Sequence, residues 1–246
     1  MKYQFWQYSL LLVLITVNTV AVGNTDSLKT HVIEGRSLHY RGDSISGVRE
    51  GVWILYDGFK LVSDSGLYVN GKKEGVWKSY HVGKLSWVGK YVNGEKEGLW
   101  VHTPYKGCIN QGSFKEGKEI GRWYTVINGV LTKDEFYNSK GKHGLQRGFY
   151  QSGKLRSKVT FVDGKKDGVV ELYYQSGKLW EICEYRMGLP ITDATEYYES
   201  GKIRRKWYHS DNGERVLTKA WDENGELFEV SKWDGTAWVE TTNTTK

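Results

Sequence analysis

This 246-residue chain has few of the residues from which catalytic and metal sites are built. It carries two cysteines and six histidines, and the histidines lie scattered along the chain without the spacing of metal ligands. The sequence has no Cys-x-x-Cys pair, no glycine-rich phosphate loop that opens a helix, and no nucleophile elbow. We therefore predict no catalytic residues, no metal and no cofactor.

Long apolar runs are also scarce, and the one that stands out lies near the start of the chain. Lys2 precedes the apolar run Ser9–Val17, and small residues follow at Ala21–Gly23. This pattern is typical of a secretory signal peptide, because the run is shorter than the roughly 20 residues that cross a bilayer as a helix. We predict that residues 1–23 are a signal peptide and that the protein is exported, to the periplasm, the cell envelope or the extracellular space. An uncleaved N-terminal anchor is the alternative.

Glycine, tryptophan and tyrosine, by contrast, are abundant and regularly spaced. The segment Tyr68–Trp77 reads YVNGKKEGVW, and Tyr91–Trp100 reads YVNGEKEGLW, one period further along. Glycines recur from Gly47 to Gly188 with a period of about 23–24 residues, a length that indicates a repeat architecture. A Gly-Lys-Leu signal lies half a period on, as at Gly83–Leu85.

Each repeat contains two short runs of β-branched and aromatic residues separated by turn signals. In the clearest repeat these runs are Gly75–Tyr80 and Leu85–Val92. The repeat ends at Asn93-Gly94, a dipeptide suited to a type I′ turn because both central residues need a positive φ. We predict one β-hairpin per repeat, since the frequent glycines would interrupt a helix.

These hairpins predict an all-β fold, an elongated, solenoid-like antiparallel meander of stacked β-hairpins. A two-stranded unit cannot bury a hydrophobic face alone, so neighbouring units must stack. We expect the repeat array to cover residues 47–233. Residues 24–46 are predicted to form an N-terminal cap, and residues 234–246 a C-terminal cap and a disordered tail.

Aromatic residues recur at equivalent positions on alternate strands, about 10 Å apart at the usual strand spacing. We expect these rings to pack mainly against one another, with direct contact to a partner as the alternative. After Trp123 the tryptophan position is lost, because Gln146 and Val170 stand there. The residues of this predicted packing or interaction face are Trp53, Tyr56, Trp77, Tyr80, Trp87, Trp100 and Trp123.

The two cysteines, Cys108 and Cys183, are predicted to be free thiols. They lie three repeats apart, which is six strands or on the order of 29 Å at normal strand spacing. A disulfide needs Cα atoms within about 7 Å of each other. The regular array therefore excludes a bond between them.

The formal net charge of +6 can favour anionic partners. The turns, however, mix both signs, as in Lys72-Lys73-Glu74, and we interpret them as solvated turns. Binding to an anionic membrane surface stays open as an alternative. Nucleic-acid binding is not expected for an exported chain.

The pattern Tyr-x-Asn-Gly-Lys-x-x-Gly-x-Trp at Tyr68–Trp77, with its copy at Tyr91–Trp100, resembles MORN repeats. The added Gly-Lys-Leu half-unit is similar to the MORN-variant form of the YwqK-type antitoxin family of bacteria. The resemblance covers about three quarters of the chain and implies a β-hairpin solenoid that acts as a binding scaffold. It brings no catalytic residues with it. It also implies protein or membrane partners and, for an antitoxin, a toxin.

Our functional prediction is a non-enzymatic, exported repeat scaffold that binds another protein, in one version an antitoxin or immunity protein. The alternative is a peripheral envelope protein that binds anionic lipid surfaces. Carbohydrate binding or hydrolysis at exposed tryptophans ranks last, because hydrolysis would need a matched pair of acidic residues. The oligomeric state does not follow from the sequence.

Overall fold

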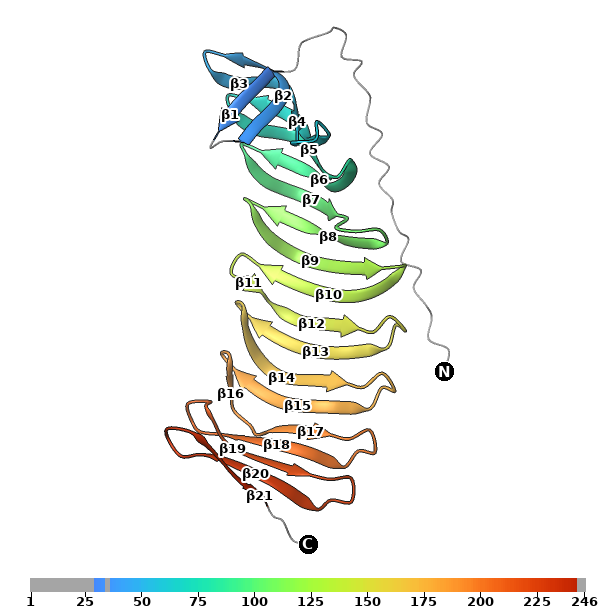
Figure 1. Cartoon of the computed structure of the whole chain (residues 1–246), viewed down its shortest axis with the longest axis vertical. Helices are drawn as coiled ribbons and strands as arrows, with labels where there is room; N and C mark the ends of the chain where they lie inside the picture. The colour runs from blue at the N-terminus through green and yellow to red at the C-terminus, as the bar shows by residue number, and fades with distance from the viewer. Residues whose placement is uncertain (1–28, 34–35, 243–246) are drawn as a thin grey trace.

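The computed structural model describes residues 29–33 and 36–242, and the predicted signal peptide lies outside them. The regular structure of this part is one antiparallel β-sheet, whose strands follow one another along the long axis of the molecule (Figure 1). The strands are β1 (Lys29–Ile33), β2 (Arg36–Ile45), β3 (Val48–Tyr56), β4 (Val62–Val69), β5 (Lys72–His81), β6 (Lys84–Val92), β7 (Glu95–His102), β8 (Cys108–Lys115), β9 (Lys118–Ile127), β10 (Val130–Asn138), β11 (Gly141–Lys142), β12 (Gly144–Phe149), β13 (Leu155–Val162), β14 (Lys165–Tyr173), β15 (Leu179–Arg186), β16 (Leu189–Pro190), β17 (Ala194–Tyr197), β18 (Ile203–His209), β19 (Arg215–Trp221), β20 (Leu227–Trp233) and β21 (Trp238–Thr242).

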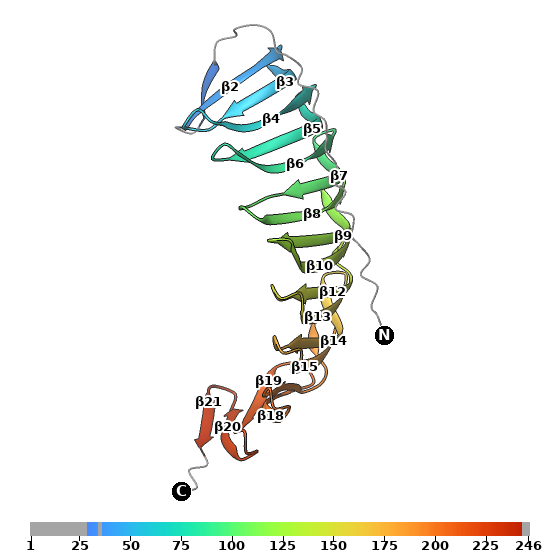
Figure 2. The ribbon, with the colours of Figure 1, turned by 90° about the vertical axis from the view of Figure 1, so that its right-hand side faces the viewer.

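The pairing of these strands is that of a meander. Consecutive strands pair antiparallel, except that the two-residue strands β11 and β16 pair only with β10 and β15. The sheet continues at these places through the pairs β10–β12 and β15–β17. At the two ends of the described sheet, β1 pairs with β2 and β21 with β20. The sheet is open rather than a barrel, and Figure 2 shows it from the side. The predicted all-β hairpin meander is confirmed.

The turn chemistry expected from the sequence is also confirmed. The predicted runs Gly75–Tyr80 and Leu85–Val92 lie within β5 and β6. In the turn that follows, Asn93 has a φ of 52° and Gly94 a φ of 89°, as a type I′ turn requires. The β5–β6 turn also has a positive φ at both central residues, but its first central residue is Val82, with a φ of 48°.

Val82 is an unfavourable residue for its position, because a β-branched side chain in the left-handed region clashes with the backbone. We expect Val82→Asn to stabilise the fold by about 1 kcal/mol, since asparagine tolerates this conformation. Thermal unfolding followed by circular dichroism measures the effect. The control is Val76→Asn, an exposed strand position without a positive φ, which should be slightly destabilised. Equal shifts in both variants would show that strain at Val82 is not the cause.

The core of the N-terminal half is a column of aromatic rings, with one ring on each strand from β2 to β10. Ring centroids of neighbouring members lie 4.7–6.5 Å apart, mostly edge to face, a geometry that adds to simple burial. The four tryptophans are 2–4% exposed. This aromatic ladder consists of Tyr40, Trp53, Tyr68, Trp77, Tyr91, Trp100, Phe114, Trp123 and Tyr137.

Each tryptophan of the ladder lies over a glycine on the preceding strand, at the same sequence offset in every repeat. A Cβ atom on Gly66 would lie 2.3 Å from the indole ring of Trp77. The strand register shifts at this glycine, as in a β-bulge. The indole N–H of Trp77 donates to the carbonyl oxygen of Leu67, the residue that follows Gly66, at 3.0 Å. The other pairs are Gly42 with Trp53, Gly89 with Trp100 and Gly112 with Trp123.

Basic residues cover the ladder and complete its burial. The ammonium group of Lys73 lies 4.0 Å from the centroid of the Trp77 ring and 5.1 Å from that of Tyr91, a cation–π arrangement. Lys96 lies in the same way over Trp100 and Phe114. Burial lowers the pKa of both lysines. The lysine of the repeat motif is therefore part of the packing.

The next residues of the motif fix the turn of the following repeat. A carboxylate oxygen of Glu74 accepts the backbone N–H of Asn93 at 2.9 Å, and the N–H of Gly94 donates to the carbonyl of Lys73 at 2.9 Å. The same carboxylate contact recurs at Glu50 with Asn70, Glu97 with Glu116, and Asp167 with Met187. These repeats thus position the next one through an acidic residue that directly precedes the second glycine of the motif.

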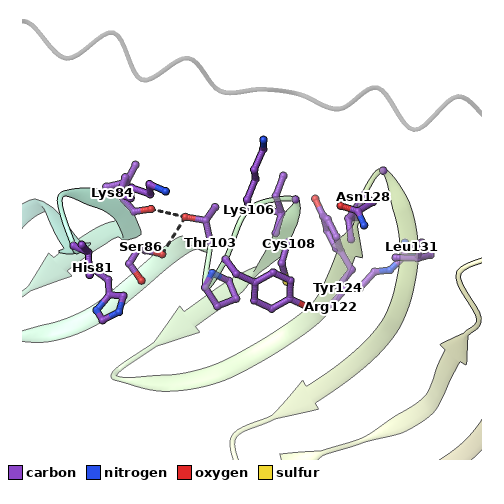
Figure 3. Close-up of a pocket in the computed structure, with 18 residues that line it drawn as sticks. His81, Lys84, Ser86, Thr103, Lys106, Cys108, Arg122, Tyr124, Asn128 and Leu131 are labelled. Atoms are coloured by element: carbon purple, nitrogen blue, oxygen red, sulfur yellow. Dashed lines mark hydrogen bonds between the residues drawn. The ribbon is translucent and has the colours of Figure 1, made fainter.

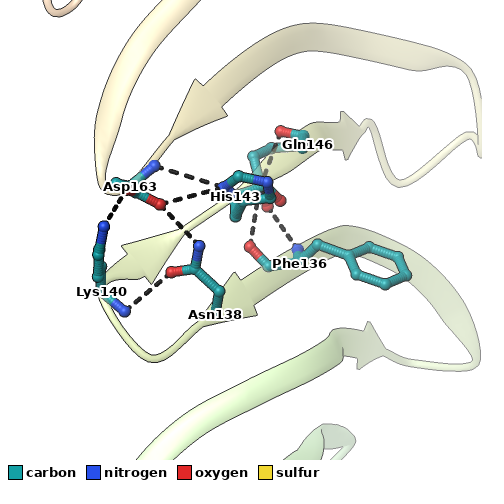
Figure 4. A network of polar contacts seen from close by, with 7 residues as sticks. Phe136, Asn138, Lys140, His143, Gln146 and Asp163 are labelled. Atoms are coloured by element: carbon teal, nitrogen blue, oxygen red, sulfur yellow. Dashed lines mark hydrogen bonds and ion pairs between the residues drawn. The ribbon is translucent and has the colours of Figure 1, made fainter.

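Where the tryptophans end, Gln146 takes over the role of the indole. Its side-chain amide donates to the carbonyl oxygen of Phe136 at 2.9 Å, and its Oε1 accepts the N–H of Phe136 at 2.8 Å (Figure 4). Beside it, Asp163 contacts Asn138 and Lys140. Val170 occupies the next equivalent position and is also buried. Both positions that lack the tryptophan are therefore filled. Gln146 occupies the first through hydrogen bonds to the backbone, and Val170 occupies the second as a smaller apolar side chain.

The C-terminal half is held together at its hairpin tips. The hydroxyl of Tyr150 donates to the carbonyl oxygen of Tyr173 at 2.6 Å, and Tyr174 and Tyr198 repeat this contact one hairpin further each time.

Both cysteines are free and buried, which confirms the prediction for Cys108 and Cys183.

A pair of facing carboxylates in this half predicts a pH-dependent variant. Glu181 lies opposite Glu196 in the β15–β17 pair, and burial, followed by the charge of Glu196, raises the pKa of Glu181. An acidic group whose pKa is raised in the folded protein stabilises the fold fully below its unfolded pKa. This contribution to the free energy of unfolding is lost as the pH rises through the folded pKa. Glu181→Gln should therefore raise the free energy of unfolding at pH 7, and the gain should vanish at acidic pH. Urea denaturation at several pH values tests this; a gain that grows on acidification would contradict it.

Candidate functional site

A groove opens between the tips of three neighbouring hairpins in the N-terminal half of the array. It lies among the β5–β6 turn, the β7–β8 loop and the β9–β10 turn, and has a volume of about 1220 Å³. Figure 3 shows Thr103, Lys106 and Cys108 between Lys84 on one side and Asn128 on the other.

The groove forms because a long loop lies between two short turns. Two residues connect β5 to β6 and β9 to β10, whereas the segment 103–107 connects β7 to β8. The N–H of Thr103 donates to the carbonyl oxygen of Ser86 at 2.7 Å, and its hydroxyl donates to that of Leu85 at 2.6 Å. At the other end the N–H of Asn128 donates to the carbonyl oxygen of Gly107 at 2.7 Å. The loop is thus fixed on both sides, and the groove is preformed.

Apolar side chains make up much of the lining. Leu85, Ile109, Val126 and Leu131 contribute aliphatic surface, and the rings of Tyr105 and Tyr124 add aromatic surface. Tyr105 is 56% exposed and Leu85 43%, so this surface is open to a partner. Apolar concave surface with a few polar groups is the usual character of a binding site.

The charged residues of the lining are cationic. Lys84, Lys106 and Arg122 contribute to it, and no aspartate or glutamate does. Arg122 is oriented by the buried carboxylate of Asp134, whose Oδ1 lies 2.6 Å from the guanidinium Nε. Asp134 also pairs with Arg147, so one carboxylate is shared by two guanidinium groups.

The seven aromatic residues predicted from the sequence do not line this groove. Trp53, Trp77, Trp100 and Trp123 lie in the ladder, and Trp87 stacks on His102 with 3.7 Å between ring centroids. Tyr56 and Tyr80 are half-buried. The structure thus places the ladder tryptophans in the packing role. The groove was missed, although Pro104 and the departure from the repeat between His102 and Cys108 marked its loop.

Within the described ranges, no three His, Cys, Asp or Glu side chains come together in a way that could hold a metal ion. Over the same residues, the structure contains no helix with the length and apolar character needed to cross a membrane. The ionisable side chains of the motif are engaged in cation–π and turn contacts instead.

Comparison with known families identifies the repeats of the C-terminal half. Residues 142–163, 166–187 and 193–211 each match the MORN repeat variant. Repeats of this kind generally mediate binding to proteins or membranes. The three matches are consecutive, and they fall in the part of the chain in which Tyr150 and its equivalents join the tips.

Among curated proteins none matches this sequence. Of solved structures, TarM is similar with 14% identity over 41% of this chain and 19% of its own length, at a TM-score of 0.29. A mutant of S. aureus TarM in complex with fondaparinux, alpha-GlcNAc-glycerol and UDP gives 14% identity over 46% and 21%, at 0.30. The GtfA/B complex bound to UDP and GlcNAc gives 14% over 42% and 23%, at 0.26. The chain spans about a fifth of the length of these structures.

Proposed function

We propose that this chain is a non-enzymatic, exported repeat scaffold that binds a protein partner, and that the groove between the hairpin tips is where the partner docks. The observation that carries the proposal is the preformed, largely apolar groove of about 1220 Å³. The MORN-variant matches support the same class of function. A groove fixed before binding favours affinity, because little conformational entropy is lost when the partner arrives.

The packing supports a protein partner over a lipid surface. Much of the basic character of the motif lies over aromatic rings, as for Lys73 and Lys96, and is not displayed towards an anionic surface. The groove is concave, lying between hairpin tips, whereas a bilayer surface is best met by projecting apolar residues.

In its antitoxin or immunity version, the proposal specifies a toxin as the partner. Co-expression with a toxin encoded next to this chain should then restore growth, and the two proteins should elute together in gel filtration. The matched control is a charge-reversed groove variant, Lys84→Glu with Lys106→Glu. If this variant restores growth as well as the wild type does, toxin neutralisation does not depend on the groove.

The general proposal is tested by cross-linking in the cells that produce the protein. A tagged wild-type chain is cross-linked and purified, and mass spectrometry compares its partners with those of the groove variant and of Lys115→Glu with Lys118→Glu. The second variant changes the net charge by the same amount at the β8–β9 turn. We expect a partner that is captured by the wild type and the control but lost in the groove variant. If no partner is enriched with wild-type protein, the scaffold function is wrong.

Export is tested separately by cell fractionation and by N-terminal sequencing of the purified protein. The proposal expects the protein outside the cytosol and a mature chain that begins after residue 23. Recovery in the cytosol with the initiating Met1 retained would contradict it.

A further inference from the structure

The groove has a charge character of its own that points to the chemistry of what it binds. Eighteen residues line it, and none is acidic. The whole chain contains 29 acidic residues in 246, so eighteen average residues would include about two. Elsewhere both signs occur side by side, as in Lys72-Lys73-Glu74 at the start of β5. The groove therefore departs from the rest of the surface by lacking carboxylates.

Two of its cations are available to a partner. Within the described part of the chain, Lys84 and Lys106 form no ion pair with a carboxylate, and both are exposed. The third, Arg122, shares the carboxylate of Asp134 with Arg147. An anionic group in the groove would thus meet attraction from several sides.

The size and shape of the groove favour a peptide segment. Its volume of about 1220 Å³ exceeds the roughly 300–1,000 Å³ of typical small-molecule pockets. Leu85, Ile109 and Leu131 line the groove between the tips, where the side chains of an extended peptide can reach their aliphatic surface. The apolar lining and the cationic residues together require both apolar and acidic side chains in the occupant.

We propose that the groove binds an extended acidic peptide segment of the protein partner, whose apolar side chains occupy the aliphatic surface while its Asp or Glu side chains face Lys84 and Lys106. This inference rests on the protein-binding function proposed above and names the chemistry of the segment that docks. Specificity for acidic segments comes from the charge of the groove, and the burial of apolar side chains supplies most of the affinity.

The test uses a phage-displayed library of random twelve-residue peptides, selected against the full chain. Enriched sequences are synthesised with a fluorescent label, and binding is measured by fluorescence anisotropy. We expect the enriched peptides to combine apolar with acidic residues. Lys84→Glu with Lys106→Glu should weaken their binding at least about tenfold, because two attractions become repulsions. Lys115→Glu with Lys118→Glu should change it less than about twofold, since these exposed residues lie at the opposite tips of β8 and β9.

A second variant tests the apolar part of the inference. Leu85→Asp places a negative charge on the aliphatic surface and should abolish binding of the same peptides; circular dichroism shows whether the sheet is intact. Enriched peptides that are basic or purely polar, or that bind the groove variants as well as the wild type, would overturn the proposal. So would a library that yields no binder.

The remaining outcomes separate this inference from the general function. Binding to phosphatidylglycerol vesicles that is lost in Lys84→Glu with Lys106→Glu, without enriched peptides, would assign the groove to a lipid and overturn the peptide. A cellular partner that is still cross-linked by the groove variant would overturn the groove inference and leave the scaffold function intact. Absence of any partner for the wild type removes the scaffold function, whatever the library yields.

Discussion

Replacing Trp77 by alanine should lower the free energy of unfolding by about 3–5 kcal/mol, the range for removal of a large buried aromatic side chain. Trp77 is 2% exposed and contacts the rings of Tyr68 and Tyr91, with centroids 5.0 and 6.2 Å away. The variant removes these contacts together with the cation–π contact to Lys73. It also leaves the carbonyl oxygen of Leu67 without its indole donor.

The position of Trp77 within the repeat array makes this loss of stability more serious. In a linear repeat protein each unit is stabilised mainly by its immediate neighbours, so a weak unit also weakens the interfaces on both of its sides. Trp77 contacts rings on both neighbouring strands, β4 and β6. We therefore expect unfolding of Trp77→Ala to become less cooperative, with a broader denaturation transition.

Urea denaturation followed by circular dichroism measures the effect, with Val76→Ala as the matched control. Val76 is the preceding residue on the same strand, points to the other face of the sheet and is 44% exposed. Its replacement should cost less than about 1 kcal/mol. Trp77→Phe, which keeps a ring and loses the donor, should fall between the two. A cost for Trp77→Ala that equals the cost for Val76→Ala would show that the ladder is not the core of the fold.

The hairpins and turns of this molecule could be predicted because their determinants are local. Asn93-Gly94 specifies its turn through the φ values that those two residues adopt. The free state of Cys108 and Cys183 followed from the period, since a regular meander separates strands by a fixed distance for each repeat. Three consecutive repeats in the C-terminal half match the MORN repeat variant.

The partners of the tryptophans could not be predicted in the same way. Gly66 and Trp77 meet only because β4 and β5 pair with a bulge at that glycine, and the sequence does not state where a bulge falls. The available signal was the constant offset between this glycine and its tryptophan, which recurs for Gly42, Gly89 and Gly112. Gln146 likewise reads as a loss of the motif until its contacts with Phe136 are known.

The groove was beyond sequence prediction for a different reason. It is not a motif but a difference in length between neighbouring connections, with the segment 103–107 between two two-residue turns. Its walls come from strands that are up to five apart in the order of the sheet, from β5 to β10. Its charge character emerges only when these residues are brought together.

The second large effect is expected at Gly66, where alanine should destabilise the protein by about 1–3 kcal/mol through overpacking. The added Cβ would lie 2.3 Å from ring atoms of Trp77, and these atoms belong to the body of the indole, which cannot turn aside in a packed ladder. Gly66 does not have a positive φ, so backbone strain is not the cause. Gly58→Ala is the control, because no atom lies within 4 Å of its Cβ position and its φ is not positive either.

A double-mutant cycle isolates the contact between the two residues. If the indole is what excludes a side chain at Gly66, the alanine should cost less in a Trp77→Leu background, where the space above it is larger. We expect a coupling energy of about 1 kcal/mol or more, as for residues in direct contact, measured from urea denaturation of the wild type, both single variants and the double variant. Additive costs would mean that the glycine is required for the bulge itself rather than for the ring. The glycine and the tryptophan would then be two independent requirements of the repeat, and their constant offset along the sequence would have no packing basis.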